Sequence, residues 1–192
     1  MSEDPYVDPD TGVMVNRLGI TDANELPRVE TNHAFVRDAQ LQDHRLDGGY
    51  DLPHLQAFHR HLFGDVYPWA GDFRTVNIAR TGMFGDWRHI RDYLDEVFGN
   101  LAAEDHLRGL SGDQVVARAA HYLGEVNAAH PFRDGNDRTQ RAFFRQLLRD
   151  AGWSLRWSKV TPEDNEHASE ASLNGDNGPL EEVLRRAASR LD

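Results

Sequence analysis

The sequence predicts one mainly α-helical domain that carries a single short β-hairpin. Most of the 192 residues lie in segments whose apolar side chains recur every three or four positions, as they do along one face of a helix. Only residues 73–78 are rich in side chains that favour strands. The chain has no internal repeat and no linker rich in Gly, Ser or Pro, and its length suits one core rather than two.

The first part of the chain predicts a flexible start followed by two helices. We expect residues 1–12 to be flexible and a helix to run from Asp22 to about Leu46. The apolar positions of this helix are Leu26, Val29, Phe35, Val36 and Leu41. A second helix is expected over residues 52–62, and Gly64 is expected to end it.

The middle of the chain predicts the hairpin and a third helix. Residues 73–78 are bounded by Gly71 and Gly82, which favours a short hairpin. A helix is expected from about Trp87, because six apolar residues recur at helical spacing: Ile90, Tyr93, Leu94, Val97, Phe98 and Leu101.

The last part of the chain predicts four more helices. Ser111 is a suitable N-cap for the first of them, which should end just before His130 because the residue before a proline is steered away from helical geometry. The next helix should begin at Asn136 and end at Ala151-Gly152. Two further helices complete the domain, the last of them over residues 180–191.

Composition excludes several classes of protein. A net charge of −11 argues against general nucleic-acid binding, which depends on clustered Lys and Arg. The absence of cysteine removes disulfides and thiolate chemistry. No apolar run is long enough to cross a membrane, and the acidic residues 1–10 do not resemble a secretory signal, so we expect a cytoplasmic protein.

Residues 130–141 combine a base, a carboxylate, a glycine turn and two arginines in the order His-Pro-Phe-Arg-Asp-Gly-Asn-Asp-Arg-Thr-Gln-Arg. Gly135 and Asn136 favour a tight turn whose amides converge on an anion at the N-terminus of the following helix. Arg138 and Arg141 are three residues apart, so both project from one helix face, where their guanidinium groups suit phosphate. The segment predicts a phosphate-handling site.

The remaining residues of this segment have predicted roles in the same site. His130 is the group best suited to accept a proton at neutral pH. Asp134 is a candidate ligand for Mg²⁺ on the phosphates, although it can instead cap the helix that follows Gly135. Phe132 is expected to anchor the loop in the core.

The segment resembles the signature of the Fic family, His-x-Phe-x-Asp/Glu-Gly-Asn-Gly-Arg-x-x-Arg, with Asp137 in place of the second glycine. Residues 67–78, Tyr-Pro-Trp-Ala-Gly-Asp-Phe-Arg-Thr-Val-Asn-Ile, resemble the family's stretch before and within its β-hairpin "flap". Residues 16–22 resemble its N-terminal opening. The likeness covers most of the chain and implies a single Fic-type helical bundle over residues 1–192, with the pre-flap and flap at 67–84 and the motif at 130–141.

The resemblance implies a protein adenylyltransferase, which moves AMP from Mg²⁺-bound ATP to a Ser, Thr or Tyr hydroxyl of a target protein. It assigns the catalytic base to His130 and the metal to Asp134. The residues implied to bind the nucleotide phosphates are Gly135, Asn136, Asp137, Arg138 and Arg141. The edge of the flap is implied to pair with the target through Arg74, Thr75, Val76, Asn77 and Ile78.

Asp137 leaves several outcomes open. A carboxylate about 4 Å from a phosphate oxygen is opposed by about 4 kcal/mol at an effective dielectric constant near 20. The result can be a slowed AMP transferase, a transferase for another nucleotide, phosphate or phosphocholine donor, or a catalytically impaired module that binds a nucleotide or partner. Activity stays intact if Asp137 points outward or joins Asp134 on the metal.

Regulation in the family often uses a Ser/Thr-x-x-x-Glu-Gly/Asn helix whose glutamate pairs with the second motif arginine. The match here is Thr21 to Glu25, but Leu26 follows it, so we expect no internal inhibitor. Nothing evident in the sequence would pair with Arg141. We therefore expect the chain to be a toxin controlled by a separate small antitoxin that supplies the inhibitory glutamate.

Other polar clusters have plainer interpretations. Arg145 and Arg149 lie one and two turns beyond the motif, and we expect them to be solvated or salt-bridged. His54, His59 and His61 suggest a metal cluster, but His59 and His61 diverge on a helix, so we expect surface packing instead.

Overall fold

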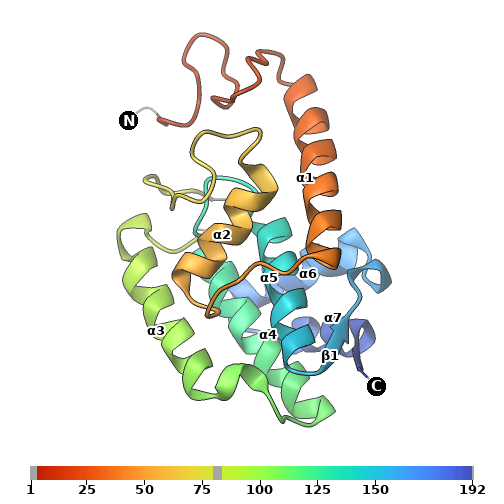
Figure 1. Ribbon diagram of the computed structural model, residues 1–192. Coiled ribbons are helices and arrows are strands. Elements are labelled where there is room, and N and C mark those ends of the chain that lie inside the picture. Colours follow the sequence, from red (N-terminus) through yellow and green to blue (C-terminus); the bar gives the residue numbers. More distant parts are fainter. Residues whose placement is uncertain (1–3, 80–83, 192) are drawn as a thin grey trace.

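The computed structural model describes residues 4–79 and 84–191 and confirms a mainly α-helical domain (Figure 1). Its α-helices are α1 (Glu25–Asp43), α2 (Leu52–Phe63), α3 (Ile90–Ala103), α4 (Gly112–Ala129), α5 (Asn136–Asp150), α6 (Pro162–Leu173) and α7 (Gly178–Ala187). Short 3-10 turns cover Trp87–His89, Asp105–Leu107 and Trp157–Lys159. Two strands, β1 (Trp153–Leu155) and β2 (Ala188–Arg190), pair antiparallel with Ser154 opposite Ser189.

Helices α4 and α5 form the centre of the bundle. Helix α5 packs on α2 and α4, while α4 also contacts α3, α6 and α7 (Figure 1). Phe143 and Leu147 of α5 and Tyr122 of α4 are completely buried at this centre. Among the described residues, no helix has both the length and the apolar character that a membrane span requires.

The ends of α4 follow the sequence prediction. Ser111 begins the helix with a capping box, in which its backbone N–H donates to Oε1 of Gln114 at 3.0 Å. The helix ends at Ala129 because His130 adopts left-handed angles, φ 44° and ψ 63°, immediately before Pro131. The motif loop therefore starts at a defined point on the central helix.

Two predicted helices differ from the structure. Two of the apolar positions that predicted the first helix, Phe35 and Val36, are 75% and 56% exposed, and the buried stripe of α1 is Leu26, Glu30, Ala34 and Leu41. Helix α7 ends at Ala187 rather than near Leu191, because the chain then pairs with β1. In both cases tertiary packing, rather than apolar spacing alone, decides the outcome.

The expected flexible start is packed onto the domain from residue 4 onward. Tyr6 is buried with its ring edge-on to Trp69, at a centroid distance of 5.4 Å. Its hydroxyl accepts a 3.1 Å hydrogen bond from the backbone N–H of Thr75. A salt bridge of 2.8 Å joins Asp4 to Arg133 of the motif loop. The start of the chain thus contacts Trp69, the predicted hairpin segment at Thr75, and the motif loop.

The predicted strand over residues 73–78 is not formed. These residues are irregular, and the turn of the predicted hairpin lies outside the described residues. The backbone N–H of Arg74 donates to the carbonyl of Pro131 at 2.9 Å, so this end of the segment bonds to the motif loop. At the other end the carbonyl of Ile78 accepts from the N–H of Phe84 at 3.4 Å, a contact between the two sides of the predicted hairpin.

Candidate active site

The turn between α4 and α5 depends on Gly135. This residue has φ 77° and caps α5, and a Cβ atom added to it would lie 2.4 Å from Cε2 of Phe63. Left-handed angles and close packing both require glycine here. The prediction of a tight glycine turn at the start of a helix is confirmed.

The side chain of Asn136 stabilises the loop that precedes it. Its side chain is buried and bonds twice to Phe132: Oδ1 accepts from the backbone N–H at 2.9 Å, and Nδ2 donates to the carbonyl at 2.8 Å. The implied role of Asn136 at the nucleotide phosphates stays a prediction. Phe132, expected as a core anchor, is buried.

His59 supports the loop from α2. Its Nε2–H donates to the carbonyl of Asp134 at 2.9 Å, and its Nδ1 accepts from the N–H of Gly71 at 2.8 Å. Its ring stacks on Phe132 at a centroid distance of 3.9 Å. Burial lowers the pKa of His59 to about 3. The expectation of surface packing was wrong for His59 and for His54, which are both buried.

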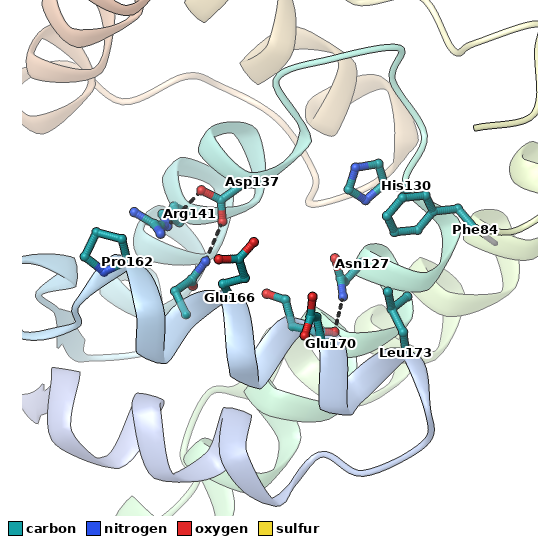
Figure 2. A pocket seen from close by; sticks show the side chains of 11 residues that line it. Phe84, Asn127, His130, Asp137, Arg141, Pro162, Glu166, Glu170 and Leu173 are labelled. Carbon is teal, nitrogen blue, oxygen red and sulfur yellow. Dashed lines mark hydrogen bonds and ion pairs between the residues drawn. The ribbon is translucent and has the colours of Figure 1, made fainter. Parts of the chain in front are cut away.

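His130 lies at one end of a cavity of about 230 Å³ between α4, α5 and α6 (Figure 2). The imidazole stacks on the ring of Phe84 at a centroid distance of 3.7 Å and an interplanar angle of 16°. Asn127, one turn earlier on α4, donates to the carbonyl of Ser169 at 3.0 Å and so joins α4 to α6. Arg141 and Asp137 lie at the other end of the cavity.

Asp137 does not turn toward Asp134; it pairs with Arg141. Its Oδ2 lies 3.2 Å from Nε of Arg141, and its Oδ1 accepts from Nδ2 of Asn165 on α6 at 3.0 Å (Figure 2). Arg141 also lies 5.5 Å from the ring centroid of Trp157. The expectation that nothing in the chain would pair with Arg141 was wrong, because residues i and i+4 of a helix are neighbours.

Arg138 faces a different carboxylate. Its guanidinium pairs with Glu30 of α1 and lies 4.7 Å from the ring centroid of Phe63. Glu30 also accepts a 2.7 Å hydrogen bond from the hydroxyl of Tyr67, and burial, reinforced by Glu30, raises the pKa of that hydroxyl. Both motif arginines therefore meet carboxylates of their own chain. Glu25, by contrast, is exposed at the start of α1.

Asp134 is the motif carboxylate available for a metal. Its Oδ1 accepts from the N–H of Gly135 at 2.6 Å. Among the described residues, no group of three or more histidine and acidic side chains forms a metal site. Magnesium at phosphates is commonly held by only one or two protein carboxylates. The role of Asp134 as a magnesium ligand stays a prediction.

Of the two arginines beyond the motif, Arg145 is salt-bridged and Arg149 is exposed, as predicted. Nη2 of Arg145 lies 2.7 Å from Oδ1 of Asp38, and Nη1 of Arg149 donates to the carbonyl of Gln42 at 3.1 Å.

The segment predicted to dock the target contains both exposed and buried residues. Thr75 and Asn77 are exposed, whereas Arg74 is buried and cannot contact a target directly.

Several residues of the site were not predicted. They are Glu30 of α1, Phe84, Trp157, and the α6 residues Asn165, Glu166 and Glu170 that line the cavity. The burial of Glu30 could have been predicted, because it lies on the same helix face as Leu26 and Ala34. The α6 residues had none, because α6 is polar around most of its surface and only the fold brings it to the motif.

Comparison with known proteins places the chain in a family. The Fic/DOC family model matches residues 49–148. The protein adenylyltransferase VbhT of Bartonella schoenbuchensis is 43% identical over 186 residues, which are 96% of this chain and 39% of VbhT. "Probable protein adenylyltransferase y4lH" of Sinorhizobium fredii is 40% identical over 96% of this chain and 95% of its own length.

A solved structure shares the fold. The N-terminal Fic domain of a VirB-translocated Bep effector protein from Bartonella quintana, with bound ADP, is 25% identical, has a TM-score of 0.90 and covers 97% of this chain and 95% of its own. This chain belongs to the Fic/DOC family, so the resemblance inferred from residues 130–141 is confirmed. The chain spans 39% of the length of VbhT but nearly all of y4lH.

Proposed function

We propose that this chain is a protein adenylyltransferase, which transfers AMP from ATP to a Ser, Thr or Tyr hydroxyl of a target protein. One observation carries the proposal: a single cavity has a histidine at one end and the second motif arginine at the other. A general base and a phosphate-binding cation are the two groups that this transfer needs. The adenylyltransferase names of two relatives at 40% identity or more support the same activity.

In the proposed reaction, His130 accepts the proton of the target hydroxyl. The hydroxyl oxygen attacks the α-phosphorus of ATP, a new P–O bond forms, and the bond to the leaving pyrophosphate breaks. Arg138 and Arg141 hold the β- and γ-phosphates, and the backbone amides at the start of α5 stabilise charge on the α-phosphate. A magnesium ion on Asp134 would neutralise part of the phosphate charge.

The ion pair between Asp137 and Arg141 competes with the substrate that donates the transferred group. Arg141 can hold a phosphate fully only after it exchanges Asp137 for the phosphate oxygens. The cavity is also lined by Glu166 and Glu170, which disfavour a highly charged ligand. These carboxylates favour a second candidate function, transfer from a donor with a different or smaller charged group, such as another nucleotide or a phosphocholine carrier.

Labelled donors distinguish these functions. The chain is incubated with a cell lysate and with ATP labelled at either the α- or the γ-phosphate. Adenylyl transfer predicts protein labelling from the α-label alone, and His130→Ala should remove that labelling while the protein remains folded. Labelling from the γ-phosphate would indicate phosphotransfer, and equal labelling by His130→Ala would exclude His130 as the base.

Two partners belong to this proposal. The first is the target protein, which we propose contacts the exposed Thr75 and Asn77. The second is a small antitoxin whose glutamate would compete for Arg141 by a charge-assisted hydrogen bond. Coexpression with the neighbouring gene tests the second partner, because an antitoxin should copurify and reduce labelling.

A further inference from the structure

Arg74 is the largest side chain that the fold buries completely, with 1% of its surface exposed. An arginine in the interior normally pairs with a carboxylate. The acceptors that Arg74 bonds among residues 4–79 and 84–191 are instead all main-chain carbonyl oxygens. Burial lowers the pKa of this guanidinium, although an arginine stays charged under all ordinary conditions.

These carbonyls belong to two segments that are distant in sequence. Nε donates to the carbonyl of His130 at 2.8 Å, and Nη2 donates to that of Ala129 at 3.1 Å. On the other side, Nη1 donates to the carbonyl of Val76 at 2.7 Å and Nη2 to that of Gly85 at 2.5 Å. One planar group therefore joins the end of α4 to both Val76 and Gly85.

The contacts at α4 have a specific consequence for His130. A helix ends with carbonyls that lack intrahelical partners and carry partial negative charge, which a cation stabilises. Here the carbonyls of Ala129 and of His130 itself both accept from Arg74. The left-handed backbone of His130, which is uncommon for a residue other than glycine, is therefore fixed by this guanidinium.

The contact at Gly85 fixes the other partner of the imidazole. Phe84, the residue before Gly85, stacks on His130 at 3.7 Å between ring centroids. Arg74 thus bonds to the backbone of His130 and to the residue beside Phe84. Arg74 therefore bonds to the backbone at or beside both residues of the stacked pair.

We propose that Arg74 is a positioning residue for the reaction: its four carbonyl bonds hold the His130 imidazole against Phe84 in the orientation that accepts the target's proton. This inference rests on the proposed role of His130 as the base. Arg74 touches neither the nucleotide-binding arginines nor the target, so it should affect the rate of transfer rather than the affinity for ATP. A displacement of about 1 Å in such a group can lower a rate about 100-fold.

The test uses Arg74→Lys, since lysine keeps the charge but has three donors on one nitrogen and cannot span four carbonyls. NMR measures the ring-current shift that Phe84 imposes on the His130 ring protons, calorimetry measures ATP affinity, and α-labelled ATP measures transfer. We expect the ring-current shift to be lost, transfer to fall about 100-fold, and the dissociation constant for ATP to change less than about threefold. Arg149→Lys, which also alters an arginine bonded to a backbone carbonyl, is the matched control and should change none of the three.

A folded Arg74→Lys variant that keeps the ring-current shift would overturn the proposal, as would an equal loss of ATP affinity and transfer. The NMR measurement needs no activity, so it judges Arg74 even if His130→Ala shows that the proposed function is wrong. If Arg74→Lys does not fold, a measurement on the unaltered protein tests the proposal instead. Slow exchange of the Arg74 Nε proton with water supports its bond to the His130 carbonyl, and exchange as fast as that of exposed arginines contradicts that bond and the proposal with it.

Discussion

The two ends of the motif are held by different kinds of interaction. The loop that carries His130 is fixed by buried hydrogen bonds from Arg74, His59 and Asn136, most of them to main-chain groups. The arginines at the start of α5 are held by carboxylates, Arg138 by Glu30 and Arg141 by the 54% exposed Asp137. The base is therefore built into the fold, whereas the phosphate-binding end can exchange one anion for another.

This difference explains how a carboxylate can replace the motif glycine without disrupting the fold. Asp137 lies on the exposed side of α5, where it reaches Arg141 and Asn165 rather than the buried turn. Its effect should fall on donor binding. Changes in the loop should instead affect stability and rate.

The largest expected effect comes from breaking the buried turn with Gly135→Ala. The new Cβ would be 2.4 Å from Cε2 of Phe63, and the residue would keep φ 77°. Left-handed geometry costs about 1 to 2 kcal/mol and overpacking adds about 1 to 3 kcal/mol. Urea denaturation should show this loss of stability, and transfer should disappear.

Gly152→Ala is the matched control for that change. Gly152 has φ 90° but no atom within 4 Å of an added Cβ, so only the left-handed geometry is penalised. The two substitutions should differ by the overpacking energy. Equal destabilisation would show that Phe63 does not constrain the turn.

A second effect follows from the neutral His59 that supports the loop. Its pKa is about 3 in the folded protein and near 6.5 when unfolded, chiefly because of burial. Below pH 6.5 the unfolded state binds a proton that the folded state excludes, so stability falls as the pH is lowered toward 3. The expected contribution is about 1.4 kcal/mol per pH unit within this window.

His59→Gln isolates this contribution, because glutamine can still form hydrogen bonds but does not titrate. Urea denaturation at pH 7, 6 and 5 should give a shallower loss of stability for the variant than for the unaltered protein. Parallel losses would mean that His59 is protonated in the fold and would weaken the distinction between a neutral loop and a charged phosphate-binding end.

The sequence predicted local features of the site better than its tertiary contacts. The end of α4 before Pro131, the Gly135 turn and the start of α5 depend on neighbouring residues, and the structure confirms them. Arg74 was predicted to meet the target but is buried, and two of its carbonyl partners, Ala129 and His130, lie more than fifty residues away in the sequence. No local pattern marks such a contact.

The partners of the motif arginines show the same limit. The i, i+4 spacing of Asp137 and Arg141 allows an ion pair, but the same spacing is equally compatible with an arginine that faces phosphate, so the sequence alone does not decide between the two. Glu30 reaches Arg138 only because the fold brings side chains of α1 and α5 together along their length, as the pairs Asp38–Arg145 and Gln42–Arg149 also show.

The smallest expected effect is also the most direct test of the difference between the two ends of the motif. Asp137→Asn removes the charge that competes for Arg141 but keeps the size of the side chain, while Asp164→Asn alters a neighbouring α6 carboxylate that pairs with Arg186. Both changes are made together with His130→Ala, so that ATP binding is measured by calorimetry without turnover. We predict that Asp137→Asn binds ATP about tenfold more tightly, equivalent to about 1.4 kcal/mol, and that Asp164→Asn leaves affinity unchanged. Equal or weaker ATP binding by Asp137→Asn would contradict the account.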